Sequence, residues 1–437
     1  MDRRKIKKAG FATLGCKVNQ YETEAMAELF RNKGYKTVGF SERADVYVIN
    51  TCSVTNMSDR KSRQMIHRAK KNNPDAVICV TGCYAQVSPE EVLDIDGVNL
   101  VIGTMGRSEI ADIADRLDSG SKVDMTGDIL KNHRFENLSV TGCTDRTRAY
   151  IKAQEGCSQF CSYCIIPFAR GPVRSRPVAD ILSEARRLAA NGFTEAVLTG
   201  IHIASFGKDS GEGDLENLLK KVSQTDGIRR IRLSSIEPMT LNEKFIAGIK
   251  ECEKLCPHFH ISLQSGSDSV LKRMNRHYTT EDFANIVAGL RDAYPDAAIT
   301  TDVMVGFPGE SDEEFAETVE FMKKTGFARA HIFEYSPRKG TKAAAMDDQI
   351  DPVIKKERSG ILFEVAGESE KRFLDSHIGA VTEVLFERRC KNKPGFYEGK
   401  TANYMTVEAM SDDDISGKYF NVKTEKREGN VLIGSIL

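Results

Sequence analysis

The strongest constraint on the fold is a repeated alternation of short apolar, β-branched segments with amphipathic helical segments in the middle of the chain. Such alternation is typical of βα units, whose parallel strands are covered by helices. Only six units fit between residues 148 and 345, whereas a closed barrel of this kind needs eight. We therefore expect an open, partial (βα)6 barrel. Its predicted strands are 149–154, 195–200, 228–234, 257–263, 300–306 and 330–335.

The region before the barrel predicts a separate domain. Residues 1–118 also alternate between strand and helix, which indicates a parallel-sheet α/β domain. Residues 119–147 have weak periodicity and much Gly, Ser, Thr and Asn, so we expect them to form a linker. The strand candidates of this first domain are 9–15, 45–50, 76–82 and 99–103.

The region after the barrel changes character. The barrel domain, 148–373, is expected to end in a long amphipathic helix at about 351–373. From residue 375 to 437, five short strand candidates are separated by turn signals. This pattern predicts a small all-β barrel of the OB type. The expected fold class is therefore α/β, with an N-terminal parallel-sheet domain, a central partial barrel and a C-terminal β-domain.

Composition indicates in which cellular compartment the protein works and what role its cysteines have. The 437-residue chain has a net charge of −1 and no stretch of eighteen apolar residues. Its start, MDRRKIKKAGFATLG, contains no apolar run of signal-peptide length. We therefore expect a cytoplasmic protein that does not enter a membrane. In a reducing compartment, the eleven cysteines are interpreted as metal or redox ligands before they are interpreted as disulfides.

Two basic runs without acidic residues stand out. Arg60–Lys71 (RKSRQMIHRAKK) carries six Lys or Arg and is either a solvated helix face or a local nucleic-acid surface. Phe168–Arg176 (FARGPVRSR) carries three Arg and directly follows a cysteine cluster. That position favours a contact with a substrate or a phosphate group.

The cysteine cluster lies in GCSQFCSYCIIPFARG, residues 156–171, and consists of Cys157, Cys161 and Cys164. These three residues, here called the barrel trio, follow a predicted strand and precede a predicted helix. They therefore lie where barrel active sites are built. Three thiolates can hold three irons of a four-iron cluster and leave the fourth iron open to a small molecule. The alternative is a structural zinc site, for which Cys143 would be a possible fourth ligand.

A second set, here called the N-terminal trio, consists of Cys16, Cys52 and Cys83. Each follows a predicted strand, and the carboxyl ends of parallel strands lie along one edge, where open α/β folds bind ligands. Gly15 and Gly82 precede two of these cysteines and would let the backbone pass close to a bulky cofactor. We expect the three sulfurs to converge there. The alternative is three unrelated buried thiols.

The C-x-x-x-C-x-x-C pattern at the end of the first barrel strand resembles the signature of the radical S-adenosylmethionine (SAM) enzymes. With the N-terminal trio, the whole chain resembles their methylthiotransferase branch. It is most similar to the subgroup that modifies N6-threonylcarbamoyladenosine beside the anticodon of tRNA. The segments that carry the similarity are TLGCKVNQYE (13–22), INTCSVT (49–55), QEGCSQFCSYCIIPFARGPVRSR (154–176), TGIHIASFGKD (199–209), RLSSIEP (232–238), LQSGSD (263–268) and VGFPGE (305–310).

This resemblance implies a transferase that inserts a methylthio group at C2 of the modified adenosine. It implies two [4Fe–4S] clusters. The cluster on the barrel trio would generate a 5′-deoxyadenosyl radical from SAM, and the auxiliary cluster on the N-terminal trio would carry the sulfur. Two SAM molecules would be used per product, one as methyl donor and one as radical source. A radical suits this reaction because no side chain can deprotonate an unactivated C–H bond at neutral pH.

The resemblance also implies two partners, a tRNA anticodon loop and a low-potential electron donor. Two alternatives keep the same chemistry but change the acceptor to a different adenosine or to a protein side chain. A third alternative is a non-enzymatic RNA-binding iron–sulfur protein that senses redox state. A SAM-dependent change in the EPR spectrum of the reduced cluster would distinguish an enzyme from such a sensor.

Residues at the predicted strand ends and beside the barrel trio are the candidates for SAM contacts. For each, the alternative is an ordinary structural role at a strand end. Glu237 and Arg176 either pair with a charged partner or bind the charged end of SAM. The candidates are Tyr163, Arg176, Thr199, Gly200, Ser234, Glu237, Gln264 and Val305.

The C-terminal β-domain is the candidate RNA-binding part, because the resemblance implies a domain of the TRAM type. Basic and acidic residues nearly balance in this region, so charge alone gives RNA binding little support. Small β-barrels bind single strands through basic grooves and stacking aromatics. The alternative is a structural barrel with core aromatics. The candidate RNA contacts are Arg388, Arg389, Lys391, Lys393, Phe396 and Tyr404.

Overall fold

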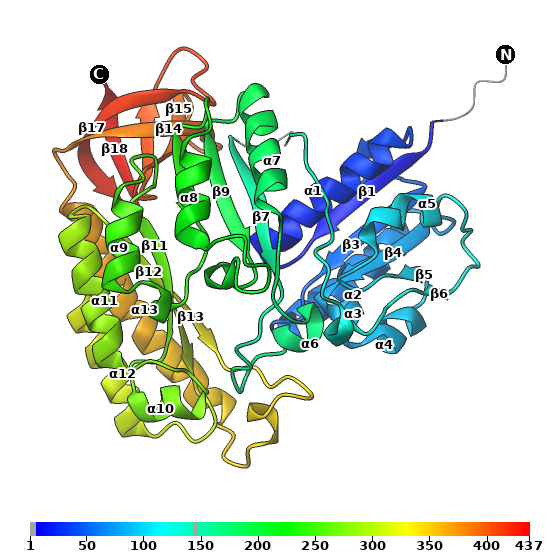
Figure 1. Ribbon diagram of the computed structural model, residues 1–437, viewed down its shortest axis with the longest axis horizontal. Helices are drawn as coiled ribbons and strands as arrows, with labels where there is room; N and C mark the ends of the chain where they lie inside the picture. Colours follow the sequence, from blue (N-terminus) through cyan, green and yellow to red (C-terminus); the bar gives the residue numbers. More distant parts are fainter. Residues whose placement is uncertain (1–5, 143–146) are drawn as a thin grey trace.

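The computed structural model describes residues 6–142 and 147–437. Figure 1 shows an N-terminal α/β part and a C-terminal β-barrel on different sides of a central part made of strands and helices. Within the described ranges, no helix is both long enough and apolar enough to span a bilayer.

The N-terminal part contains a six-stranded sheet whose neighbouring strands all run parallel. Every residue of the two central strands β3 and β4 is buried, as expected for a parallel sheet that is covered on both faces. The predicted parallel-sheet architecture is confirmed. In spatial order the strands are β2 (Lys36–Val38), β1 (Lys8–Thr13), β3 (Val46–Thr51), β4 (Val77–Gly82), β5 (Val98–Val101) and β6 (Val123–Asp124).

Helices cover both faces of this sheet. Helices α1 (Lys17–Asn32) and α5 (Ile110–Ala114) pack on one face. Helices α2 (Asn56–Asn72), α3 (Cys83–Val87) and α4 (Pro89–Asp94) pack on the other. Helix α2 carries the first basic run, and most of its cations lie on the exposed face of the helix.

The central part contains six parallel strands in the order β7-β9-β10-β11-β12-β13. Strands β10 and β11 are joined through isolated bridges from Ile231 to Leu255 and from Ile236 to Ile261. At the outer edge, β8 (Arg174–Ser175) runs antiparallel to β7. The predicted open barrel is therefore confirmed. The six strands are β7 (Arg148–Glu155), β9 (Glu195–Gly200), β10 (Arg230–Leu233), β11 (His258–Gln264), β12 (Ala298–Val305) and β13 (Arg329–Glu334).

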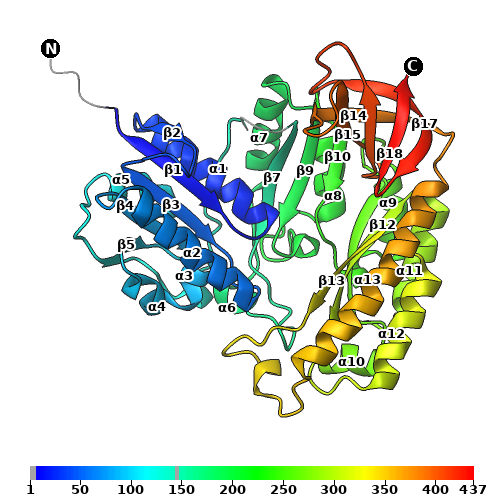
Figure 2. The ribbon, with the colours of Figure 1, turned by 180° about the vertical axis from the view of Figure 1, so that it is seen from behind.

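Most helices of the central part lie along the outer side of this arc (Figure 2) and share one apolar core with the strands. The long predicted helix is present as α13, which packs on β13 and α12. The helices are α6 (Ile166–Arg170), α7 (Val178–Ala190), α8 (Leu215–Ser223), α9 (Glu243–Lys250), α10 (Asp268–Arg273), α11 (Thr280–Ala293), α12 (Asp312–Thr325) and α13 (Pro352–Asp375). Short 3-10 turns are η1 (Arg107–Glu109), η2 (Ile129–Lys131), η3 (Ile203–Ser205), η4 (Pro238–Thr240) and η5 (Ala343–Ala345).

The C-terminal part is a closed barrel in the order β14-β15-β16-β18-β17. Neighbouring strands run antiparallel except for β16 and β18, which are parallel. The predicted small all-β barrel is confirmed. Its strands are β14 (Val381–Arg389), β15 (Phe396–Thr401), β16 (Thr406–Met410), β17 (Tyr419–Glu428) and β18 (Val431–Ile436).

The segment expected to be a linker is described up to residue 142, and it packs against both of its neighbours. Leu138 and Val140 are buried in a small apolar cluster with Tyr21 of α1. The Tyr21 hydroxyl donates a hydrogen bond to the Leu138 carbonyl at 2.5 Å. The Val140 amide donates to Glu184 of α7 at 3.1 Å. These contacts tie helix α1 of the N-terminal part to helix α7 of the barrel.

Candidate functional site

The N-terminal trio lies at the carboxyl ends of β1, β3 and β4, which are neighbours in the sheet. Cys16 is the N-cap of α1, Cys52 directly follows β3, and Cys83 begins α3. Cys52 and Cys83 are buried, whereas Cys16 is exposed. The charges of Cys52 and Cys16 both act on Cys83. The structure therefore brings together the three residues that the sequence predicted would converge.

The backbone beside this trio requires glycine. Gly82 has φ of +97° and ψ of −163°, a conformation that is open essentially only to glycine. A Cβ atom on Gly82 would lie 2.4 Å from the Thr51 carbonyl oxygen. At Gly15, a Cβ atom would lie 2.9 Å from the Cys52 sulfur. These two loops can lie this close to the Cys52 side chain and to the Thr51 backbone because Gly15 and Gly82 have no side chain.

Gly82→Ala is therefore expected to lower the free energy of unfolding by about 3 kcal/mol, because backbone strain adds to a clash with a carbonyl group. Gly34→Ala is the matched control. Gly34 also has positive φ, +90°, but its Cβ atom would meet nothing within 4 Å, so we expect a loss of about 1 kcal/mol. Denaturant unfolding of the two variants measures the difference. Equal losses would show that the close approach to Thr51 has no energetic consequence.

Arg170 of α6 connects the barrel to the N-terminal trio. Its Nε atom donates a hydrogen bond to the Cys83 sulfur at 3.2 Å. Burial raises the pKa of Cys83 to about 12, and the Arg170 charge opposes that rise. A thiol must lose its proton before it binds a metal, so Arg170 favours the form of Cys83 that can act as a ligand.

Arg170 belongs to a buried charged network between the two parts. Its guanidinium donates to Glu22 of α1 at 2.6 Å and to Glu155 of β7 at 3.2 Å. Arg107 and Lys152 also form ion pairs with Glu22. Although burial opposes ionisation, these cations hold the pKa of Glu22 well below its usual range. The network compensates charges that would otherwise be costly to bury.

The barrel trio lies on the loop between β7 and α6, and hydrogen bonds hold this loop in place. The Cys157 amide donates to the Gly171 carbonyl at 3.0 Å, and the Cys164 amide donates to the Cys161 carbonyl at 2.9 Å. Burial raises the pKa of Cys157 to about 11 and that of Cys164 to about 12, and Cys161 adds to both. The three thiols are therefore close enough to influence one another.

Arg276 is the counterpart of Arg170 at the barrel trio. Its Nη1 atom donates to the Cys161 sulfur at 3.3 Å, and its Nη2 atom donates to Glu237 at 2.7 Å. Glu237 thus pairs with Arg276. Burial opposes ionisation of Glu237, but hydrogen bonding with His202 and the Arg276 charge lower its pKa. The sequence pattern did not identify Arg276 as a partner of the barrel trio, because Arg276 lies 115 positions from Cys161.

A single cavity of about 340 Å³ is lined by residues from both cysteine regions. Val54 and Thr55, which follow Cys52, form one wall, and Tyr163 and Cys164 of the barrel loop form another. Its size falls within the range of small-molecule sites. The remaining lining residues, all from the central part, are Ile165, Ile166, Gln264, Asp302, Met304, Phe333, Glu334, Tyr335 and Ser336.

Two predicted SAM contacts carry buried oxygen atoms without a hydrogen-bond partner in the described structure. They are Ser234 Oγ, beyond the end of β10, and Gln264 Oε1, at the end of β11. Gln264 also has φ of +70°, which is rare for a residue other than glycine. Such strain and unmet bonding capacity are concentrated at ligand sites. Together with Tyr163 in the cavity wall, they fit a polar ligand at this end of the barrel.

Of the other predicted SAM contacts, three lie at strand ends as expected, whereas Arg176 does not. Thr199 and Gly200 end β9, and Val305 ends β12, as the sequence indicated. Arg176, in contrast, is buried against α7, where its guanidinium forms an ion pair with Glu184 and a hydrogen bond with Tyr21 at 3.3 Å. It does not pair with Glu237, and its charge is already balanced within the interface.

The prediction that the second basic run contacts a substrate or a phosphate group is wrong. The side chains of Arg170, Arg174 and Arg176 are all buried. Arg174 donates to the carbonyls of Asn132, Pro172 and Arg170 at 2.9–3.3 Å. The run needs no acidic residue of its own, because other segments supply the carboxylates and because carbonyl groups inside and outside the run accept the remaining hydrogen bonds.

Four of the predicted RNA contacts line an open hollow of about 500 Å³ on the C-terminal barrel: Arg388, Arg389, Lys391 and Lys393. Lys393 lies 4.3 Å from the centroid of the Phe396 ring. Several cations already have acidic neighbours. Lys393 pairs with Glu408 and Glu428, and Arg388 pairs with Glu398.

Tyr404, the sixth predicted RNA contact, lies elsewhere. Its ring stacks on His258 of β11 with centroids 4.7 Å apart. Arg148 and Arg232 lie 5.2 and 4.6 Å from the ring centroid. Tyr404 thus closes the amino-terminal end of the barrel strands, and its ring is not available to stack on RNA at the hollow. It lies in the turn after β15, with φ of +71°.

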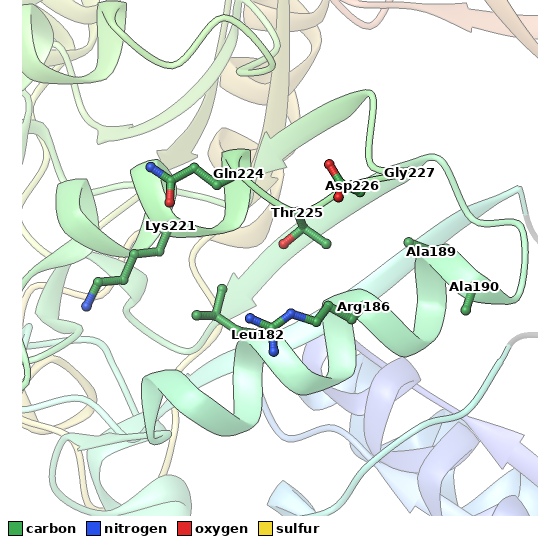
Figure 3. A pocket seen from close by; sticks show the side chains of 9 residues that line it. All are labelled: Leu182, Arg186, Ala189, Ala190, Lys221, Gln224, Thr225, Asp226 and Gly227. Atoms are coloured by element: carbon green, nitrogen blue, oxygen red, sulfur yellow. The ribbon is translucent and has the colours of Figure 1, made fainter.

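A hollow of about 830 Å³, drawn in Figure 3, has no cysteine among its lining residues. It is an open groove between α7 and α8, with Arg186 on one side and Lys221 on the other. The groove has no residue in common with either cysteine region, so it is not part of the candidate site.

The donor atoms of the two trios fit an iron–sulfur cluster better than a single metal ion. Among the described residues, no group of three His, Cys, Asp or Glu side chains is arranged to hold a single ion. Cys143, the possible fourth zinc ligand, lies outside the described residues. Each trio offers three thiols and an arginine N–H directed at one sulfur. This donor set suits a larger iron–sulfur cluster, which is held by thiolates and tuned by hydrogen bonds to sulfur.

Comparison with known proteins gives two family matches and full-length relatives. Residues 8–103 match a family described as uncharacterized protein family UPF0004, and residues 151–322 match the radical SAM superfamily. The chain is 44% identical to threonylcarbamoyladenosine tRNA methylthiotransferase MtaB of Bacillus subtilis, over 95% of this chain and 93% of that protein. It is 36% identical to tRNA-2-methylthio-N(6)-dimethylallyladenosine synthase of Acetivibrio thermocellus, over 97% and 90%.

A solved structure supports the fold. The radical S-adenosylmethionine methyltransferase TsrM from Kitasatospora setae matches with a TM-score of 0.56 at 14% identity. The match covers 78% of this chain and 77% of that one. At this identity the likeness concerns the fold alone. It agrees with an α/β domain joined to a partial barrel.

Proposed function

The chain belongs to the radical SAM methylthiotransferase family, and on that premise we propose that it modifies tRNA. The proposed reaction places a methylthio group at C2 of N6-threonylcarbamoyladenosine beside the anticodon. The observation that carries this proposal is that residues from both cysteine regions line one cavity of about 340 Å³. Relatives named for this nucleoside, at 39–44% identity, support it over the dimethylallyl nucleoside, named at 34–36%.

Membership of this family means that the chain uses SAM and a [4Fe–4S] cluster. We propose that the barrel trio holds this cluster and that the N-terminal trio holds a second one. When bound, the clusters and SAM supply one-electron chemistry, a methyl group and sulfur. The proposed stoichiometry is two SAM molecules per product, with electrons from a low-potential donor.

The residues of the chain position these groups and keep water away. Ser234 and Gln264 offer side-chain oxygens to SAM, because each of these oxygens is buried at a strand end and has no hydrogen-bond partner among the described residues. Ile165, Met304 and Phe333 make much of the cavity wall apolar. An apolar wall protects a reactive species from solvent. Arg170 and Arg276 each direct an N–H at one ligand sulfur and so orient it.

The proposed tRNA contacts lie on the C-terminal barrel, at the hollow lined by Arg388, Arg389, Lys391 and Lys393. Phosphate groups would be held there by cations, whereas the modified base would be turned out of the loop into the cavity. Bases of single-stranded loops can be splayed out in this way, because they are not held by pairing.

Nucleoside mass spectrometry of tRNA from cells that lack the gene tests the proposed function. We expect 2-methylthio-N6-threonylcarbamoyladenosine to disappear, its precursor without the methylthio group to accumulate, and a plasmid copy to restore the product. If the 2-methylthio dimethylallyl nucleoside disappeared instead, the substrate would be the dimethylallyl nucleoside. Unchanged tRNA would overturn the proposal and favour a protein acceptor or a redox sensor.

A further inference from the structure

The loop after β13, residues 335–351, makes a second contact between the barrel and the N-terminal part. The first contact is the charged network around Arg170, which lies beside β7. Strands β7 and β13 are the two outermost of the six parallel barrel strands. In Figure 2 the loop, drawn in yellow, extends from β13 toward α2. The N-terminal part is therefore attached at both edges of the open barrel, which restricts its rotation against the barrel.

Arg338 is the centre of this second contact. Its Nη1 atom donates a hydrogen bond to the Asn56 side chain at 2.7 Å, and its Nη2 atom donates one to the Ser53 hydroxyl at 2.7 Å. Nη2 also donates to the Asp59 carboxylate at 2.6 Å. Arg338, Ser53 and Asp59 are all buried, so water is not at hand to replace these bonds. Removal of one partner from a buried charged pair is costly, because it leaves the other charge uncompensated.

The partners of Arg338 lie in residues 53–59, which directly follow Cys52 of the N-terminal trio. In the same stretch, the Asn56 amide donates a hydrogen bond to the Ser336 hydroxyl at 3.1 Å. Ser336 also lines the cavity that the two cysteine regions share. The loop after β13 therefore holds the chain beyond Cys52 at the wall of this cavity.

The same loop is bonded to the barrel trio. The Ala343 amide donates a hydrogen bond to the Ser162 carbonyl at 2.8 Å, and Ser162 directly follows Cys161. Ala343 is buried in an apolar cluster, which fixes this end of the loop. The Thr341 hydroxyl and amide both donate to the Arg338 carbonyl, at 2.8 and 3.0 Å, and so keep the stretch from Arg338 to Ala343 compact. One short stretch of chain therefore connects the two trios through hydrogen bonds.

We propose that Arg338 is a positioning residue that keeps the N-terminal trio at a fixed distance from the barrel trio. This inference rests on the proposed function, in which both trios serve one carbon atom of one base. Displacement of a positioned group by about 1 Å can lower a rate about a hundredfold. In the described chain, Arg338 forms no hydrogen bond with a cysteine, so it acts through the residues that follow Cys52 and through its own loop.

Arg338→Met removes the hydrogen bonds and the charge and leaves a long, flexible side chain. Cleavage of SAM to 5′-deoxyadenosine should be unchanged, because the loop of the barrel trio keeps its own hydrogen bonds. The methylthiolated nucleoside should fall at least about tenfold, because the N-terminal trio is no longer held in place. The two products are measured in the same reactions, with the iron content confirmed to be equal. A variant that was only less stable would lose both products together.

Hydrogen–deuterium exchange gives a readout that does not depend on activity. It is measured on the cluster-loaded protein without reductant or RNA. Amides of residues 53–59 should exchange faster in Arg338→Met than in the unmodified protein, because this stretch loses its attachment. Amides of β7 should exchange equally in both proteins, because the network around Arg170 is intact.

Lys339→Met is the matched control. Lys339 is the next residue along the chain, is exposed and, among the described residues, forms no ion pair within 4.0 Å. Its replacement should leave both products and the exchange unchanged. Asp59→Asn tests the contact from the other side and covers the case that Arg338→Met does not fold. It should shift the product ratio in the same direction, and it should add nothing further to Arg338→Met.

The inference is overturned if the two products fall together in the folded variants, if their ratio is unchanged, or if exchange in residues 53–59 stays the same. The proposed function fails differently. In that case the unmodified protein would form 5′-deoxyadenosine but no methylthiolated tRNA, and the exchange measurement would still decide whether Arg338 holds the two parts together.

Discussion

Replacement of Cys16 by alanine is expected to remove about half of the iron, from about eight to about four atoms per chain, and to leave reductive SAM cleavage intact. The reason is structural. The N-terminal trio lies at three strand ends of one sheet, whereas the barrel trio lies on a single loop of the central part. Each set should therefore assemble its cluster without the other. Methylthiolation of tRNA should be lost, because its sulfur is proposed to come from the N-terminal trio.

Cys157→Ala is the complementary variant and should keep about four irons while losing SAM cleavage. Cys252→Ala is the control, because Cys252 lies just beyond α9 and belongs to neither trio. It should keep all iron and both activities. Iron and sulfide assays after anaerobic reconstitution, with chromatography of 5′-deoxyadenosine, measure the outcome. Loss of all iron from folded Cys16→Ala would contradict two independent sites.

Arg170→Met is expected to lower the free energy of unfolding by about 3 to 5 kcal/mol, because it leaves buried carboxylates of Glu22 and Glu155 with too few cations. Both acids are almost fully buried, so water cannot replace the guanidinium. The variant should also lose iron preferentially from the N-terminal trio, since the hydrogen bond to Cys83 disappears. Denaturant unfolding and iron analysis measure the two effects.

Arg43→Met serves as the control for this prediction. Arg43 pairs with Asp75 at 3.7 Å, and their side chains are 70% and 83% exposed. Exposed pairs of this kind contribute about 0 to 1 kcal/mol. If Arg170→Met were as mild as Arg43→Met, the buried network would not stabilise the contact between the N-terminal part and the barrel.

Features that arise from local sequence patterns could be predicted from the sequence alone. Strands β3 and β4 each begin with a run of four apolar residues, and the six barrel strands recur between amphipathic helices. Because parallel strands end at one edge, three cysteines that each follow a strand could be predicted to converge. The spacing within the barrel trio likewise fixed its position on one loop.

The buried charges could not be predicted in the same way. Arg170 and its partner Glu22 are 148 positions apart, and Arg276 and Cys161 are 115 positions apart. A run of arginines without nearby acids has the same local pattern whether it contacts phosphate or buried carboxylates. The difference arises only when distant segments pack together, which local periodicity does not encode.

Tyr404 illustrates the same limit. An aromatic residue next to basic strands is typical of an RNA-stacking surface. In the structure, the turn that carries Tyr404 reaches the barrel, and its ring stacks on His258 between Arg148 and Arg232. Which face of a small barrel docks on its neighbour depends on tertiary contacts such as the pair between Arg230 and Glu383 at 2.8 Å.

Anomalous X-ray diffraction at the iron edge, from crystals of the anaerobically reconstituted protein, would show where each cluster binds. We expect two separate iron clusters, one held by Cys16, Cys52 and Cys83 and the other by Cys157, Cys161 and Cys164, on two sides of one cavity. Iron at only one of these sites, or two clusters that do not open onto the same cavity, would contradict this expectation.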